Sequence, residues 1–139
     1  MIDLSIVIVS WNVKELLERC LSSVAECCRR GALQCEVIVV DNASADGSPE
    51  MIRRRFPDVK LIASEHNLGF VKGNNIGVAH SNGRHILLLN PDTEVVEDAL
   101  QTMVAYIDHH ADVGAVGPML LFPDGQVQPS RRRFPTLAT

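Results

Sequence analysis

The chain has 139 residues, a formal net charge of −4 and 22% charged residues. A chain of this length suits one domain, residues 1–139, that buries roughly 68% of its unfolded surface. The acidic balance gives no bulk attraction to nucleic acid, and no apolar run approaches the ~20 residues that a membrane-spanning helix requires. Polar residues near the start interrupt the apolar pattern, so we expect no signal peptide.

Strands and helices are expected to alternate along the chain. Short apolar runs, such as LSIVIV at residues 4–9, predict strands that are buried on both faces of a sheet. Apolar residues spaced by three and four predict helices with one apolar stripe. In chain order we expect a strand over residues 4–9, a helix over 16–28, a strand over 37–40, a helix over 49–55, a strand over 59–63, a helix over 69–80, a strand over 86–89, a helix over 96–107 and a strand over 113–116.

Several local signals accompany these elements. Asn12, with Glu15 three residues later, predicts a capping box at the start of the first helix, and Gly31 predicts its end. Gly77 belongs to a series of glycines four residues apart, which predicts close packing of the third helix on the sheet. Asp124-Gly125 predicts a turn in the polar tail.

The cysteines do not have the spacing of a zinc site. They are Cys20, Cys27, Cys28 and Cys35, and no two of them form a Cys-x-x-Cys pair. Cys20 and Cys27 are seven residues apart and share one face of the expected helix. We therefore expect reduced cysteines that pack in the core.

The alternation of elements predicts an α/β fold of the Rossmann-like, doubly wound kind. Such a fold has a mostly parallel sheet, helices on both faces and right-handed crossovers, and it binds ligands beyond the carboxyl ends of its strands. Polar residues follow four of the expected strands within a few positions. They are Ser10-Trp11-Asn12, Asp41-Asn42-Ala43-Ser44, Asn67-Leu68-Gly69 and Asn90-Pro91-Asp92. This set predicts a polar small-molecule site at one edge of the sheet.

Two carboxylates in this set, Asp41 and Asp92, suit different tasks. A carboxylate accepts a ring or amide N–H, or it ligates a hard cation such as Mg²⁺ or Mn²⁺. A divalent cation would let a carboxylate approach a diphosphate that otherwise repels it. Simpler interpretations stay open: Asp41 caps the turn that follows it, Asp92 serves a helix terminus, and Lys72 is a solvated lysine.

Four motifs occur in order along most of the chain, and a fifth follows near its end. They are SIVIVSWN, VIVVDNASADGS, NLGFVKGNNIG, ILLLNPDTEV and DGQVQPSRRRFPTL. The ordered set resembles the family 2 glycosyltransferases, and within them the rhamnosyltransferase-like group of bacterial polysaccharide assembly. The resemblance implies the nucleotide-sugar-binding fold called GT-A.

The resemblance also implies roles for single residues around a nucleotide sugar. Ser10 and Asn12 would line the nucleotide pocket, and Asp41 would accept the N–H of a uracil or thymine ring. The other implied contacts to the nucleotide and its diphosphate are Asn42, Ser44, Gly69, Lys72 and Asn74.

The segment Asn90-Pro91-Asp92 takes the place of the family's Asp-x-Asp motif. The resemblance implies that Asp92 holds a divalent metal, Mn²⁺ or Mg²⁺, and that Asn90 lies beside the donor. Asn90 removes one negative charge from the doubly acidic form of the motif, so we expect weaker metal affinity. The Asn90 carbonyl could still ligate the metal directly or through water.

The implied activity is inverting transfer of a sugar from a UDP- or dTDP-sugar to a glycan or lipid-linked acceptor. It would take place in the cytoplasm, with peripheral association at the cytoplasmic face of the membrane as an open option. The resemblance puts the family's acidic base and most acceptor contacts beyond Thr139, so no catalytic residue is assigned and little turnover is expected. Arg131, Arg132 and Arg133 are expected to be a solvated basic tail, with contact to acceptor phosphates or an anionic membrane as the minor alternative.

Other functions fit the sequence less well. A nucleotidyltransferase would need a Gly-rich basic loop after the first strand, which SWNVKELLERC lacks, and a signalling receiver domain would need an acidic pair there. A dinucleotide-binding oxidoreductase would need Gly-x-Gly-x-x-Gly after a strand. A nucleotide-binding module without turnover remains the open alternative.

Overall fold

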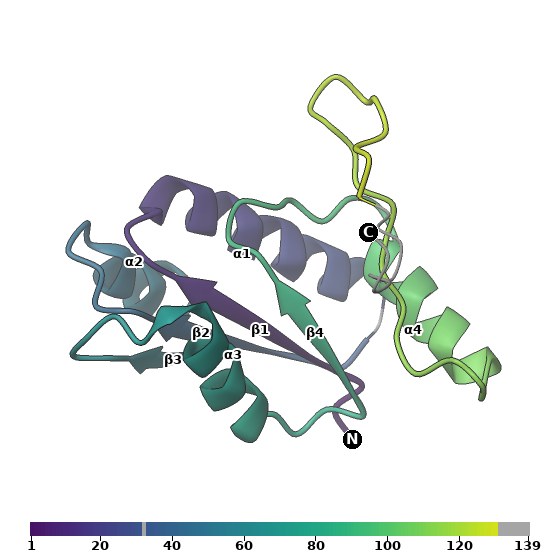
Figure 1. Ribbon diagram of the computed structural model, residues 1–139, viewed down its shortest axis with the longest axis horizontal. Helices are drawn as coiled ribbons and strands as arrows, with labels where there is room; N and C mark the ends of the chain where they lie inside the picture. Colours follow the sequence, from purple (N-terminus) through teal and green to yellow (C-terminus); the bar gives the residue numbers. More distant parts are fainter. Residues whose placement is uncertain (32, 131–139) are drawn as a thin grey trace, which may run out of the picture.

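Strands and helices alternate from residue 4 to residue 109 of the computed structural model, which describes residues 1–31 and 33–130 (Figure 1). In chain order they are β1 (Leu4–Ser10), α1 (Lys14–Arg30), β2 (Cys35–Asp41), α2 (Ser48–Arg55), β3 (Lys60–Ala63), α3 (Gly69–Ala79), β4 (His85–Leu89) and α4 (Ala99–His109). Each corresponds to an expected element with small shifts of its ends. Gly31 caps the end of α1, as predicted.

The strands form one parallel sheet in the order β3-β2-β1-β4, which confirms the predicted α/β fold. The register pairs Ser10 at the end of β1 with Asp41 at the end of β2. It also pairs Ile8 of β1 with Leu89, the last residue of β4. The carboxyl ends of the strands therefore meet at one edge, where such sheets bind their ligands.

Helices cover both faces of the sheet (Figure 1). The core on one face includes Leu17 of α1, Ile52 of α2 and Leu100 of α4, each at most 1% exposed. On the other face α3 lies against β1, where a Cβ atom on Gly73 would be 2.8 Å from Cγ1 of Val9. The predicted arrangement of helices on both faces is confirmed.

β4 is less buried than its apolar run predicts. Ile86 and Leu88 pair with Ser5 and Val7 on the face that carries α3, yet they are 44% and 53% exposed. The reason is that α3 packs over β1 and β2, while β4 is the last strand in the sheet order. The prediction of burial on both faces was wrong for this strand.

The predicted strand over residues 113–116 is also wrong, because this segment is irregular. Gly114 interrupts its apolar residues and Gly117 follows them, and glycine weakens a strand because it loses more conformational entropy on folding than other residues do. Gly114 to Val116 instead help to line a cavity of about 400 Å³ between β4 and α4. A short apolar run alone does not distinguish a strand from an irregular segment.

The predicted turn at Asp124-Gly125 is confirmed. Leu121 and Val127 form an antiparallel bridge on either side of it, and the Gly125 N–H donates to the Phe122 carbonyl at 2.8 Å. Gly125 has a φ of +83°, a conformation that glycine adopts without strain.

Gly77 packs α3 closely on β1, as predicted, since a Cβ atom there would overlap Cγ1 of Val7. We predict that Gly77→Ala lowers the free energy of unfolding by about 1–3 kcal/mol, because the overlap outweighs the ~1 kcal/mol of helix propensity that alanine adds. Chemical denaturation followed by circular dichroism measures the change. Gly114→Ala is the control, because apart from the two chain neighbours no atom of the described residues lies within 4 Å of its Cβ position. Equal effects in the two variants would contradict the packing argument.

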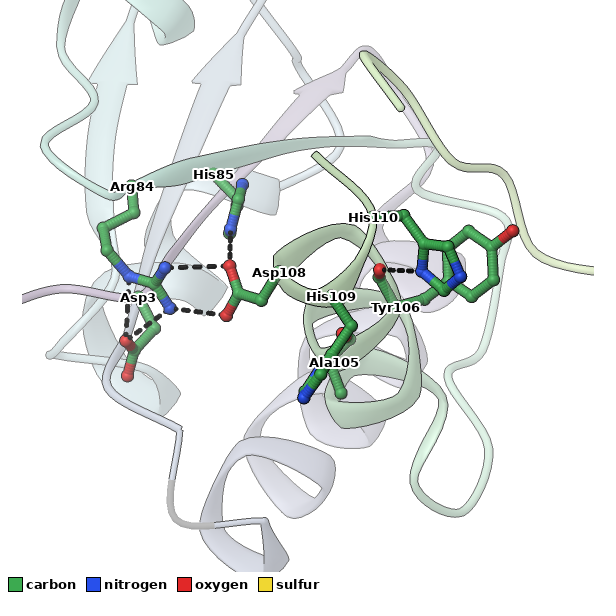
Figure 2. A network of polar contacts seen from close by, with 8 residues as sticks. All are labelled: Asp3, Arg84, His85, Ala105, Tyr106, Asp108, His109 and His110. Atoms are coloured by element: carbon green, nitrogen blue, oxygen red, sulfur yellow. Dashed lines mark hydrogen bonds and ion pairs between the residues drawn. The ribbon is translucent and has the colours of Figure 1, made fainter. Parts of the chain in front are cut away.

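A charged network joins the starts of β1 and β4 to the end of α4 (Figure 2). Arg84 donates to Asp3 Oδ1 at 3.2 Å and to the two carboxylate oxygens of Asp108 at 2.9 and 3.0 Å. The Nε2 atom of His85 lies 2.8 Å from Asp108 Oδ1. The hydrogen bonds with Arg84 and His85 hold the pKa of Asp108 well below its ordinary value of 3.8.

The lowered pKa makes this network dependent on pH. Because the folded-state pKa of Asp108 lies below 3.8, its contribution to stability is present above that pH and is lost as the pH falls through the folded-state pKa. We predict that Asp108→Asn lowers the melting temperature near neutral pH, and that the difference from the parent shrinks on acidification. Thermal denaturation across pH tests this, with the exposed Asp112→Asn as a control. A difference that does not change with pH would show that the Asp108 charge is not the cause.

Candidate functional site

A cavity of about 270 Å³ opens at the carboxyl edge of the sheet, beside the ends of β1 and β2 and the start of α3. Three residues predicted from the sequence, Ser10, Asn42 and Gly69, line it. Trp11 and Phe70 form its open side, with 55% and 62% of their surfaces exposed. The full lining is Val9, Ser10, Trp11, Asn42, Asn67, Gly69 and Phe70.

Two buried polar atoms at this edge have no hydrogen-bond partner among the described residues. They are Ser10 Oγ and Asp41 Oδ1, and each residue is only 1% exposed. The two residues are opposite each other in the register of β1 and β2. Ser10 is one of the residues that line the cavity, and Asp41 is not. A buried polar atom without a partner costs about 1–3 kcal/mol, and a ligand that satisfies it removes that cost.

The second carboxylate oxygen of Asp41 serves the turn that follows β2. Asp41 Oδ2 accepts the Ser44 N–H at 2.9 Å. Ala43, inside this turn, has a φ of +62°, which residues other than glycine rarely adopt. The simpler interpretation of Asp41 as a turn cap therefore holds for one oxygen and leaves the other oxygen free.

The loops that follow β1 and β2 are tied to each other. The Asn12 N–H donates to Ser44 Oγ at 2.9 Å, and the Ala45 N–H donates to Asn12 Oδ1 at 2.8 Å. Asn12 adopts a φ of +53° to reach both partners. Neither Asn12 nor Ser44 lines the cavity. Their observed contacts hold the loop that follows Asp41.

The capping box predicted from Asn12 and Glu15 is wrong, because the Asn12 side chain is engaged by the loop after β2. Asp46 of that loop caps α1 instead, since the Lys14 N–H donates to Asp46 Oδ2 at 2.8 Å. Asp46 Oδ1 also accepts the Ser48 hydroxyl at 2.6 Å. Burial opposes ionisation of Asp46, but the hydrogen bonds from Ser48 and Lys14 outweigh it and lower the Asp46 pKa.

Asn42 joins the end of β2 to the start of α3. Its Oδ1 accepts the Leu68 N–H and its Nδ2 donates to the Gly69 carbonyl, both at 3.4 Å. Gly69 has a φ of +77°, and its N–H donates to Asn67 Oδ1 at 2.9 Å. The amide of Asn42 is therefore committed to shaping the cavity wall, while Gly69 brings bare backbone to that wall.

Two predicted residues of α3 do not line the cavity. Lys72 is exposed, and Asn74 is only 7% exposed. The Nδ2 atom of Asn74 donates to the Phe70 carbonyl at 2.9 Å, one turn earlier in the same helix. Asn74 thus supports the turn that presents Phe70 at the open side of the cavity.

The loop after β4 is held from its backbone. The Asn90 carbonyl accepts the Thr93 hydroxyl at 2.7 Å and the Cys20 thiol of α1 at 3.7 Å. The Val95 N–H donates to Ser23 Oγ, also on α1, at 2.9 Å. These contacts do not use the side chains of Asn90 and Asp92, which are exposed.

The surroundings of Cys20 show that this loop packs over the thiol. Burial raises the pKa of Cys20 to about 12, and the negative charges of Asp92 and Glu94 act in the same direction. Cys20 is fully buried, as predicted for a core cysteine. It therefore remains a neutral thiol that can donate to the Asn90 carbonyl.

The residues directly after β4 offer few ligands, which fits a cation that takes most of its ligands from a substrate. Among residues 1–31 and 33–130, no three His, Cys, Asp or Glu side chains converge on a metal position. Asp92 and Asn90 are both exposed, and they offer one carboxylate and one amide carbonyl. Mg²⁺ is commonly held by one or two carboxylates together with substrate phosphates and water. The donor set fits that arrangement and does not fit a cage made of protein groups alone.

Some supporting residues could not be identified from the sequence. Asp46 bonds the first residue of α1 and Ser23 bonds the loop after β4, and no spacing rule links them to Lys14 or Val95. Asp46 does lie inside the polar stretch DNASADGS, which is the one signal that pointed to its loop. Phe70 has the residue type of an ordinary apolar helix position, and only the structure shows that its side chain is exposed.

Two features of the chain bear on membranes. Within the part of the chain that the structure describes, no helix is long and apolar enough to cross a bilayer. The predicted basic tail, Arg131 to Arg133, lies outside the described residues.

Sequence comparison relates the chain to bacterial sugar transferases. Residues 5–138 match the profile described as Glycosyl transferase family 2. The N-acetylglucosaminyl-diphospho-decaprenol L-rhamnosyltransferase of Mycobacterium tuberculosis is 28% identical over 145 aligned positions, which cover 96% of this chain and 46% of that protein. The abequosyltransferase RfbV of Salmonella typhimurium is 31% identical over 115 positions, which cover 79% of this chain and 34% of that protein. The chain thus spans less than half the length of these relatives.

Structural comparison agrees on the fold. TarS 1-349 of S. aureus in complex with UDP has a TM-score of 0.71 and 23% identity, and the match covers 79% of this chain and 33% of that one. The mannosyltransferase PcManGT of Pyrobaculum calidifontis in complex with GDP-Man and Mn²⁺ has a TM-score of 0.67 and 24% identity, over 75% of this chain and 32% of that one. These matches confirm the predicted GT-A fold. Because the family profile spans nearly the whole sequence, this chain belongs to glycosyl transferase family 2.

Proposed function

We propose that this chain binds the nucleotide of a UDP- or dTDP-sugar at the carboxyl edge of its sheet, as the donor site of a glycosyltransferase. The observation that carries the proposal is the pair of buried atoms Ser10 Oγ and Asp41 Oδ1, which have no hydrogen-bond partner among the described residues and belong to the strand ends next to the residues that line the 270 Å³ cavity. A uracil or thymine ring has an N–H for the carboxylate and a neighbouring carbonyl for the hydroxyl. One ring would satisfy both atoms, whereas adenine has no ring N–H flanked by carbonyls.

Residues around the cavity would support the rest of the nucleotide. Trp11 and Phe70 offer exposed aromatic surface against which a ring or ribose can pack. Lys72 is an exposed cation about one helical turn after Gly69, which suits a diphosphate that leaves the cavity along α3. Asn12, Asn42, Ser44 and Asn74 would act through the loops and the helix that they hold.

A divalent cation, Mn²⁺ or Mg²⁺, is proposed as the cofactor, with Asp92 as its carboxylate ligand and Asn90 beside it. When bound, the cation would neutralise charge on the leaving nucleoside diphosphate. The support from this chain is the exposure of Asp92 on a loop that is anchored through its backbone. The solved complex of PcManGT with GDP-Man and Mn²⁺ supports a metal in this fold.

Transfer of the sugar, with inversion, to a glycan or lipid-linked acceptor is proposed for the whole enzyme. The name of the Mycobacterium tuberculosis relative, which describes a diphospho-decaprenol acceptor, supports a lipid-linked one. A location in the cytoplasm or at the cytoplasmic face of a membrane stays a prediction. We assign no general base. Since the chain spans 46% of that relative, nucleotide binding without efficient turnover is the second candidate for residues 1–139 alone.

Nucleotide binding tests the donor site. UDP or dTDP with Mn²⁺ should raise the melting temperature and ADP should do little, since a ligand at 100 times its Kd adds about 2.7 kcal/mol. Asp41→Ala should weaken UDP binding roughly 10- to 100-fold in calorimetry, because a charge-assisted hydrogen bond of about 1.5–3 kcal/mol is lost. The loss should be the same without metal, because Asp41 would contact the ring.

Two further variants control this experiment. Asp58→Ala removes an exposed carboxylate that precedes the amino end of β3 and does not line the cavity, and it should leave UDP affinity unchanged. Asp41→Asn keeps the shape and one acceptor for the Ser44 N–H, so it separates loss of charge from loss of the turn. Equal responses to UDP and ADP, or parental affinity in both Asp41 variants, would refute the pyrimidine site.

A separate measurement tests the metal ligand. Asp92→Asn should abolish the extra UDP affinity that Mn²⁺ provides, and it should leave metal-free binding unchanged or slightly stronger, because a charge that repels diphosphate is gone. Glu94→Gln is the matched control, an exposed carboxylate two residues away that pairs with Arg19 at 3.6 Å. If Mn²⁺ enhances binding equally in Asp92→Asn and the parent, Asp92 is not the ligand. A purely structural aspartate would instead lower stability by about 0.5–2 kcal/mol with and without metal.

A further inference from the structure

The loop that follows β4, residues 90–95, is attached to α1 at both of its ends. The Cys20 thiol donates to the Asn90 carbonyl at 3.7 Å, and Ser23 Oγ accepts the Val95 N–H at 2.9 Å. Asp92 lies between these two attachment points, and its exposed side chain takes part in neither. The backbone around Asp92 is therefore held from outside the loop, by two side chains of one helix.

The Ser23 hydroxyl is well suited to hold a backbone N–H. It donates its hydrogen to the Cys20 carbonyl, in the preceding turn of α1, at 2.7 Å. A hydroxyl has one donor and two acceptor sites, so its oxygen remains available to the Val95 N–H. Ser23 is partly buried, and Val95 packs against the main core. Water therefore competes less for this bond than it would at an open surface.

The adjacent serine provides a matched comparison within the same helix. Ser22 is exposed, and its hydroxyl donates to the Glu18 carbonyl of α1 at 2.8 Å. Both serines thus bond to a carbonyl of the preceding turn, but of the two only Ser23 bonds the loop after β4 in the part of the chain that the structure describes. The pair of Arg19 with Glu94 is exposed on both sides at 3.6 Å, and such pairs contribute little.

The helix that provides these side chains is itself firmly placed. Its inner face contributes Leu17 and Leu21 to the core, each at most 2% exposed. Its first residue, Lys14, is bonded to Asp46 of the loop after β2. One buried helix is thus attached to the loops that follow β2 and β4, which belong to the two halves of the candidate site.

We propose that Ser23 is a positioning residue for the metal ligand Asp92: it fixes the backbone of residues 90–95 before a cation and a nucleotide bind. The inference rests on the proposed role of Asp92. Ordering a loose loop on binding would take free energy from the affinity, and a loop that is already ordered avoids this loss. The Asp92 side chain makes none of the attaching bonds, so it can still adjust to the phosphates.

Amide exchange tests the attachment without any ligand. By NMR of isotope-labelled protein, Ser23→Ala should speed hydrogen exchange of the Val95 amide roughly 5-fold, because the amide loses its acceptor. Ser22→Ala should leave this rate unchanged. Ser23→Thr keeps a hydroxyl that can bond to the preceding turn, so it should restore slow exchange. An unprotected Val95 amide in the parent, or equal rates in the parent and Ser23→Ala, would overturn the proposal.

Nucleotide binding tests the consequence for the cation. Calorimetry gives the UDP affinity of the parent and the variants with and without Mn²⁺. Ser23→Ala should reduce the enhancement by Mn²⁺ roughly 3- to 10-fold and change metal-free affinity by no more than about twofold. Ser22→Ala should behave like the parent, and Ser23→Thr should recover the enhancement. Circular dichroism checks the fold of each variant, and alanine favours the helix at both positions.

The outcomes separate this inference from the metal site on which it rests. A serine that only stabilised the fold would lower the melting temperature in Ser23→Ala and leave the Mn²⁺ enhancement equal to that of the parent. That result would overturn the role of Ser23 while Asp92 remained the ligand. Absence of any Mn²⁺ enhancement in the parent would instead refute the metal site, and this inference with it.

Discussion

The in-register parallel pairing of β1 with β2 is the constraint on which the candidate site depends. Apolar pairs such as Ile8 with Val39 are completely buried beneath the helices, and the same register continues to Ser10 and Asp41. A slip of one residue would turn Asp41 to the opposite face of the sheet and expose the apolar side chains of β2. The core therefore fixes the relative positions of two polar groups that contribute no apolar packing themselves.

This arrangement leaves a local energetic penalty at the edge of the sheet. Within the part of the chain that the structure describes, Ser10 Oγ and Asp41 Oδ1 are buried without hydrogen-bond partners, and each such atom costs about 1–3 kcal/mol. Nearby hydrogen bonds keep the strained turns in place: Asn12 holds the loop after β2, and Asp46 of that loop caps α1. Because these bonds are made before any ligand arrives, the ligand would not have to order the loops, and this preserves affinity.

The sequence predicted the features that follow from periodicity and missed those that depend on tertiary contacts. Apolar runs and strand ends located β1 and β2, and hence Ser10 and Asp41, because short continuous apolar runs are typical of strands in the interior of a parallel sheet. The capping box at Asn12 failed because a loop 33 residues away competes for the same side chain. The predicted strand over residues 113–116 was wrong because a strand needs a partner edge, which a short apolar run does not specify.

The two halves of the candidate site are built by different means, and this difference bears on specificity. Asp41 is buried at the end of β2 and bonded to the loop that follows, so its second carboxylate oxygen has a fixed position against which a ring N–H can be selected. Asp92 is exposed on a loop whose bonds to α1 use the Asn90 carbonyl and the Val95 N–H, so its side chain can adjust. Discrimination between bases should therefore be a property of the fold, whereas metal affinity should depend on the phosphates that arrive with the nucleotide.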